Sequence, residues 1–133
     1  MAHWLMKSEP GSYSWDELVR DTRTEWDGVR NPTARLHLKA MKKGDAAFFY
    51  HSGDERQVVG IMRVTREARP DPKDPNWVSV EVEAVGPLGP VTLKQIKAEP
   101  SLKGMELIRL SRLSVSPVRD EEWATILGMG ESR

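Results

Sequence analysis

The sequence predicts an α+β domain, with a curled mixed β-sheet or small barrel of five or six strands flanked by short helices. Two observations predict this class. Short apolar and β-branched runs are separated by turn residues, which is typical of strands. Between these runs, several segments carry helix-capping signals that are followed by apolar residues at helical spacing. The length of 133 residues fits one domain, spanning residues 1–133.

The first predicted strand and helix lie within the first twenty residues. Residues 4–8 are mostly apolar and are soon followed by a Pro-Gly pair, which is typical of a strand that leads into a turn. Ser14 lies three residues before Glu17, and this capping-box spacing indicates the start of a short helix. The stretch that follows is expected to be irregular.

A second helix is predicted to begin near residue 31. Asn31 is a suitable N-cap, and Pro32 is a suitable first helical residue. Three apolar residues then lie on one helix face, and a glycine is expected to end the helix. These residues are Ala34, Leu38, Met41 and Gly44.

The middle of the chain predicts three strands. Residues 45–52 are rich in aromatic side chains, and residues 58–65 are rich in β-branched ones. From Val78 to Ala84, apolar and polar residues alternate, which indicates a half-buried strand. The segment 69–76, rich in Pro and Asp, is expected to be a loop between the last two strands.

The C-terminal third predicts two helices and two short strands. Thr92 and Gln95 form a second box-like cap, and Pro100 is expected to close the helix that follows. Residues 107–110 and 113–115 have the composition of strands. A terminal helix is defined by three apolar residues and by the glycine expected to stop it, namely Trp123, Ile126, Leu127 and Gly128.

Composition narrows the classes of function. The absence of cysteine excludes disulfides, thiolate metal sites and thiol nucleophiles. The net charge of zero argues against a protein that coats DNA by charge alone, although residues 20–43 contain seven Lys or Arg against three Asp or Glu. Neither a signal peptide nor an apolar run long enough for a bilayer is visible. We therefore expect a cytoplasmic protein, monomeric and without a membrane partner.

Motifs for catalysis are weak. The sequence contains no Gly-rich phosphate loop, no GxSxG elbow and no HExxH pair. The three histidines, His3, His37 and His51, lie on different predicted elements and lack metal-ligand spacing. We therefore expect no enzymatic activity, no cofactor and no metal.

Four segments instead place polar residues where a predicted strand ends or a helix begins, which is where binding groups commonly lie. They are residues 7–10 (KSEP), 26–31 (WDGVRN), 50–52 (YHS) and 112–115 (RLSV). The second segment leads into a helix N-terminus, where free backbone N–H groups favour an anion or a polar acceptor. A structural interpretation is also open, with Trp26 in the core, Arg30 paired with a nearby acid and Asn31 only capping its helix.

In this order and approximate spacing, the four segments resemble the signatures of the EVE family of the PUA-like superfamily. Similar stretches continue outside the signatures, so the resemblance runs from Trp4 to about Leu127. They include residues 34–35, 41–45, 70–72 and 116–118. Two positions depart from the expected pattern, because Pro32 and Arg69 stand where we expect aromatic residues in relatives.

The resemblance implies a PUA-like fold related to the YTH readers of methylated adenosine. It also implies a non-catalytic module that holds a flipped, modified base in a concave pocket, with modified cytosine in DNA as the favoured ligand. Carried over by segment, the implied base- or ligand-binding residues are Lys7, Ser8, Trp26, Val29, Arg30, Asn31, Tyr50, His51, Ser52, Leu113 and Ser114.

Three other hypotheses stay open. A PUA-like module also suits structured or modified RNA, which the residues do not distinguish from DNA. The same pocket suits a free nucleoside or another small molecule. The third hypothesis is weak catalysis on a nucleobase or nucleotide, in which Tyr50 or His51 acts as a general acid or base. If the protein acts as a lone binding module, an effector protein or simple occlusion must supply any downstream effect.

Overall fold

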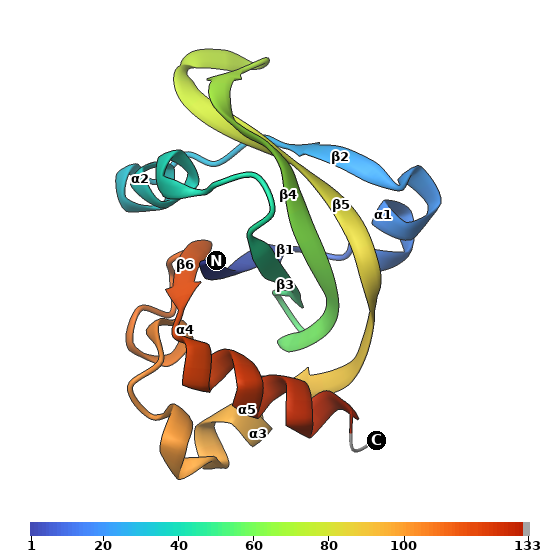
Figure 1. Ribbon diagram of the computed structural model, residues 1–133, viewed down its shortest axis with the longest axis vertical. Coiled ribbons are helices and arrows are strands. Elements are labelled where there is room, and N and C mark those ends of the chain that lie inside the picture. The colour runs from blue at the N-terminus through green and yellow to red at the C-terminus, as the bar shows by residue number, and fades with distance from the viewer. Residues whose placement is uncertain (132–133) are drawn as a thin grey trace.

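The computed structural model describes residues 1–131 and has a curled six-stranded sheet at its centre (Figure 1). The strands are β1 (His3–Ser8), β2 (Arg23–Trp26), β3 (Ala46–His51), β4 (Gln57–Asp71), β5 (Asp74–Thr92) and β6 (Val115–Val118). Their order is β2-β5-β4-β3-β1-β6, and β1 runs parallel to β3 while the other neighbours are antiparallel. The sheet is open at β2 and β6, so the predicted curled mixed sheet is confirmed and the barrel alternative is not formed.

Short helices flank the sheet, as predicted. They are α1 (Trp15–Asp21), α2 (Pro32–Ala40), α3 (Leu93–Ala98), the 3-10 helix η1 (Pro100–Leu102), α4 (Glu106–Arg109) and α5 (Asp120–Glu131). Both predicted capping boxes form, at Ser14 and at Thr92, and Asn31 caps α2 with Pro32 as its first residue. These signals are reliable because a cap needs only hydrogen bonds within three residues.

The long β4–β5 hairpin corrects two predictions. The segment 69–76, expected to be a loop, is mostly strand, because β4 and β5 stay paired out to Asp71 and Asp74. The stretch before residue 31, expected to be irregular, contains β2, which pairs with β5 from Arg23 to Trp26. In both cases the hydrogen bonds come from a distant strand, so the local sequence carries little sign of them.

The C-terminal third corrects three more predictions. Residues 107–110, expected to be a strand, form most of the one-turn helix α4, which buries Leu107. The last strand covers Val115–Val118 rather than residues 113–115. Helix α5 continues past Gly128 to Glu131, since a helical glycine costs only about 1 kcal/mol relative to alanine. Earlier in the chain, α2 ends at Ala40, before Gly44, the glycine that was expected to end it.

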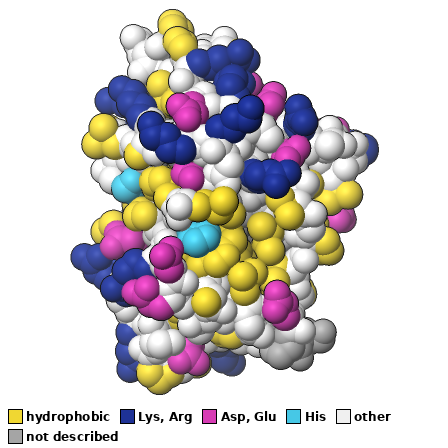
Figure 2. All heavy atoms as spheres, in the orientation of Figure 1, with side chains coloured by type: hydrophobic (Ala, Val, Ile, Leu, Met, Phe, Trp, Pro, Cys, Tyr) yellow, Lys and Arg dark blue, Asp and Glu magenta, His cyan; other side chains and the backbone are white. Residues whose placement is uncertain are grey.

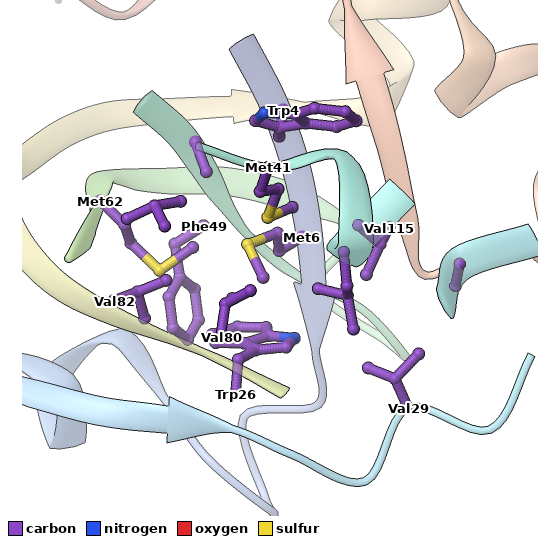
Figure 3. Close-up of a cluster of buried hydrophobic side chains, with 14 of the residues drawn as sticks. Trp4, Met6, Trp26, Val29, Met41, Phe49, Met62, Val80, Val82 and Val115 are labelled. Atoms are coloured by element: carbon purple, nitrogen blue, oxygen red, sulfur yellow. The ribbon is translucent and has the colours of Figure 1, made fainter. Parts of the chain in front are cut away.

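The core lies on both faces of the sheet. On one face, Met6, Phe49 and Val80 pack with side chains from α1 and α2. Figure 3 shows Trp26 beside Phe49, and the two rings meet edge to face with centroids 5.5 Å apart. On the other face, Phe48 packs with α3, α4 and α5. Successive strand residues point to opposite faces, which divides the core in this way.

The two ends of the sheet differ in what lies beside them. In Figure 1, α3, α4 and α5 gather at one end, and the tip of the β4–β5 hairpin projects at the other. Figure 2 shows Lys and Arg side chains gathered over the hairpin end of this face, with a hydrophobic patch below them. Within residues 1–131, none of the helices has both the length and the apolar character needed to cross a membrane.

Candidate functional site

A cavity of about 840 Å³ opens where the ends of β1 and β2 meet the loop that leads into α2. This volume lies within the range of typical small-molecule sites. Its lining combines aromatic, hydroxyl and charged side chains. The lining residues are Lys7, Ser8, Ser12, Tyr13, Thr24, Glu25, Trp26, Asp27, Gly28, Val29, Arg30, Asn31, Lys73 and Ser114.

The fold brings most of the predicted binding residues to this cavity. Seven of the eleven line it, namely Lys7, Ser8, Trp26, Val29, Arg30, Asn31 and Ser114. Leu113 instead lines a neighbouring groove, which Asn31 also reaches. The remaining three, Tyr50, His51 and Ser52, are absent from the lining of the cavity.

Trp26 forms a wall of the cavity rather than a free platform. Only 7% of the residue is exposed, because its ring packs against Phe49 and the core beneath β5. Tyr13 supplies a second, more accessible aromatic ring, and its hydroxyl donates to Asp21 at 2.9 Å. Burial raises the pKa of Tyr13, so its hydroxyl stays protonated. The cavity therefore has two aromatic side chains for contact with a flat ligand.

The loop from Asp27 to Asn31 is held in place by Asp71, at the end of β4. The carboxylate of Asp71 accepts hydrogen bonds from the backbone N–H of Gly28 at 2.9 Å and from Arg30 at 3.0 Å. Burial alone would raise the pKa of Asp71, but hydrogen bonds from Lys73, Gly28 and Arg30 hold it below its usual value. The carboxylate stays ionised and fixes the wall of the cavity.

The end of β1 is tied to the segment before β6. The Nζ atom of Lys7 donates to the carbonyl of Ser111 at 2.8 Å, and the Lys7 backbone N–H donates to the carbonyl of Ser114 at 2.9 Å. Burial lowers the pKa of Lys7 from its usual value. The hydroxyl of Ser8 donates to the carbonyl of Tyr13 at 2.6 Å and can still accept a bond from a ligand.

The segment from Tyr50 to Ser52 makes contacts within the fold and lies outside the lining of the cavity. Burial raises the pKa of Tyr50 to about 12, and its ring belongs to the core on the opposite face. The Nε2 atom of His51 accepts from the backbone N–H of Trp15 at 3.0 Å, so Nδ1 carries the proton donated to Glu55 at 2.8 Å. The backbone N–H of Ser52 donates to the last carbonyl of β1. Ligand contact by these three residues stays a prediction.

Half of the lining residues were not among the predicted binding residues, namely Ser12, Tyr13, Thr24, Glu25, Asp27, Gly28 and Lys73. Asp27 lies inside the WDGVRN segment and pairs with Lys73, which comes from the hairpin tip, at 3.6 Å. Tyr13 comes from the turn before α1. For Asp27, its place in the segment was an available signal; for Tyr13 and Lys73, the local sequence contains none. Among residues 1–131, no group of His, Asp and Glu side chains is arranged to hold a metal ion.

Comparisons with known proteins agree with the predicted family and fold. The family model of the EVE domain matches residues 2–129. Human Thymocyte nuclear protein 1 is 34% identical, over 98% of this chain and 74% of its own. A solved structure from Rhodopseudomonas palustris is 48% identical, with a TM-score of 0.94 and coverage of 99% of this chain and 94% of its own. The human THYN1 protein, solved in complex with 5-methylcytosine-containing DNA, is 33% identical, with a TM-score of 0.93. That match covers 100% of this chain and 99% of the human one. The chain therefore belongs to the EVE domain family.

Proposed function

We propose that this EVE domain binds DNA that contains a modified cytosine and holds the modified base, flipped out of its stack, in the cavity. The observation that carries this proposal is the human relative solved with 5-methylcytosine-containing DNA, because the match covers the whole of this chain. The cavity adds support, since residues from three of the four predicted segments meet there.

The cavity offers groups that suit each part of a modified cytosine. Trp26 and Tyr13 can contact the flat faces of the ring, where stacking contributes about 1–3 kcal/mol per base. The carboxylate of Asp27 can accept a hydrogen bond from the 4-amino group, which is the usual contact between an acidic residue and cytosine. Val29 offers apolar contact to an added methyl group. The hydroxyl of Ser114 can form a hydrogen bond with the edge of the base.

The energies limit how selective this site can be. Burying one methyl group contributes about 0.8 kcal/mol, which corresponds to roughly fourfold in affinity. A tight apolar pocket reaches about 1–3 kcal/mol. Removing a base from a duplex costs a few kcal/mol, and less from a single strand. We therefore expect a preference of several-fold for methylated over plain cytosine, with weaker overall binding to a matched duplex than to a single strand.

The proposal is tested with identical short oligonucleotides that differ in one central base. The set contains cytosine, 5-methylcytosine, 5-hydroxymethylcytosine and thymine, in DNA and in RNA, and binding is measured by fluorescence anisotropy at one fixed salt concentration. Thymine is informative because it has the methyl group but carries a carbonyl in place of the 4-amino group. We expect 5-methylcytosine to bind more tightly than both cytosine and thymine.

Two variants connect this preference to the cavity. Asp27→Ala is expected to reduce the discrimination between 5-methylcytosine and thymine, whereas Trp26→Phe weakens binding to every base because less ring surface is available. Asp54→Ala, at an exposed turn outside the cavity, is the matched control and keeps the wild-type preference. Equal binding to all four bases by the wild-type protein would contradict base reading.

We further infer that binding is not followed by a chemical step. The residues considered for acid–base work, Tyr50 and His51, are buried and make contacts within the fold. Incubating each oligonucleotide with micromolar protein and measuring its mass tests this inference. An unchanged mass is expected, and a product that depends on His51 would contradict it.

A further inference from the structure

A second groove, of about 380 Å³, adjoins the cavity on the side of α2 and α4. It lies between the first turn of α2 and the segment that connects α4 to β6. Its lining residues are Asn31, Thr33, Arg109, Leu110, Ser111, Arg112 and Leu113.

The groove and the cavity adjoin each other. Asn31 lines both of them, and the chain passes from Leu113 in the groove directly to Ser114 in the cavity. Lys7, which lines the cavity, donates to the carbonyl of Ser111 at 2.8 Å and so fixes one wall of the groove. A ligand that occupies the cavity therefore has the groove as an immediate extension of its site.

The charge of the groove suits an anion. Its lining contains two arginines and no carboxylate. Arg109 is paired with Glu106 through one nitrogen, whereas Arg112 is exposed and forms no ion pair with any described residue. A third hollow lies between the β3–β4 turn and the start of α3. It differs from the groove because its lining contains Asp54 and Glu55 as well as basic residues. A guanidinium without an acidic partner is well suited to phosphate, whose oxygens match its planar fork.

The groove also presents an apolar surface at its rim. Leu110 is 42% exposed, although most leucines of the fold are buried. An exposed apolar side chain beside two arginines matches the alternation of sugar and phosphate along a nucleic-acid strand. A small molecule that filled only the cavity would use neither Leu110 nor Arg112.

We propose that this groove binds the sugar–phosphate backbone next to the flipped nucleotide, with Arg112 on the phosphate and Leu110 against the sugar. This inference rests on the proposed function, because it assumes a base in the cavity. It assigns Arg112 a role in affinity but not in choice of base, since contacts to phosphate do not carry base information.

The test combines a protein variant with a chemical change in the DNA. Arg112→Ala is compared with the wild-type protein on a 5-methylcytosine oligonucleotide, while single linkages on either side of that base are replaced by neutral methylphosphonate. On double-stranded DNA the variant is expected to lose roughly eightfold in affinity at 0.1 M salt and almost nothing near 1 M, because each phosphate contact contributes a slope of about 0.9 in log affinity against log salt. On a single strand, where the slope is about 0.7, the expected loss is about fivefold. One neutral linkage is expected to weaken the wild-type protein equally and to have no further effect on Arg112→Ala.

Two control variants make the result specific. Lys94→Ala removes an exposed positive charge at the third hollow and is expected to keep the wild-type affinity. Arg112→Lys keeps the charge without the planar fork and is expected to recover part of the loss. The ratio of affinities for methylated and plain cytosine is expected to stay the same in all three variants.

The outcomes separate this inference from the proposed function. If Arg112→Ala keeps full affinity and full sensitivity to every neutral linkage, the groove is not a backbone site, even if methylated cytosine is preferred. If the wild-type protein binds all bases equally but Arg112 and one linkage remain coupled, the groove inference stands and base reading fails. Absence of binding to any oligonucleotide overturns both.

Discussion

Asp71 and Arg30 form a salt bridge of 3.0 Å that joins the end of β4 to the loop before α2. The side chain of Asp71 is fully buried, with 0% of its surface exposed. It also binds the backbone N–H of Gly28, whose φ of +78° favours glycine. Residues 41 positions apart in the chain are thereby held together, and the wall of the cavity depends on the β4–β5 hairpin.

The first prediction concerns this salt bridge. Asp71→Asn replaces an ionised acceptor by an amide, so either Lys73 loses its acceptor, or Gly28 and Arg30, which share one carboxylate oxygen, both lose theirs. We expect the free energy of unfolding to fall by about 1–3 kcal/mol. Affinity for 5-methylcytosine DNA is expected to fall as well, because the loop is less well ordered. Urea denaturation and anisotropy measure the two effects.

Asp54→Asn is the control for this prediction, because Asp54 is exposed and lies in a turn outside the cavity. It is expected to change neither quantity. If Asp71→Asn lost stability but kept its affinity, the carboxylate would support the fold without positioning the loop for the ligand.

The second prediction concerns the contact between β4 and α1. A Cβ atom added to Gly60 would lie 2.6 Å from ring atoms of Trp15, which is closer than real contacts allow. Gly60→Ala is therefore expected to lower the free energy of unfolding by about 1–3 kcal/mol, the usual cost of overpacking a core. Gly86→Ala is the matched control, because nothing lies within 4 Å of its added Cβ. Equal stability of the two variants in urea would contradict the close packing of Trp15 on β4.

The third prediction concerns the pH dependence of stability. Hydrogen bonds from Arg66 lower the pKa of Glu25 to about 2, against an ordinary value of 4.5. Because the folded-state pKa lies below the unfolded one, this contribution is complete above about pH 5 and is lost as pH falls from 4.5 towards 2. Glu25→Gln is expected to cost roughly 1 kcal/mol at pH 7, because the pair is partly exposed to solvent.

The measurement for Glu25 is urea denaturation at several pH values. The difference between the wild-type protein and Glu25→Gln is expected to shrink below pH 4.5 and to be small near pH 2. Glu9→Gln changes an exposed carboxylate at the turn after β1 and is expected to follow the wild-type curve. A difference for Glu25→Gln that stayed constant from pH 7 to pH 3 would mean that the ion pair with Arg66 contributes nothing.

Local hydrogen bonds explain which parts of the fold were predictable. The caps at Ser14, Asn31 and Thr92 were identified correctly, since each involves residues only three positions apart. Strand β2 and the outer part of the hairpin were not identified, because their pairing partners lie far away in the chain. Residues 107–110 were wrongly predicted as a strand, since Leu and Ile suit both a strand and a helical turn that buries one of its side chains, here Leu107.

The sequence by itself determined the class of the fold, the capped helices and the segments from which the cavity is built. Those features depend on side-chain periodicity, on short-range hydrogen bonds and on motifs that a family shares. Only the tertiary structure decided which side chains reach the cavity. His51 points into the fold and accepts a hydrogen bond from the backbone N–H of Trp15, whereas Tyr13, from the turn between β1 and α1, reaches the lining of the cavity. The physical reason is that the direction of a side chain at a strand end or in a turn depends on packing against distant elements.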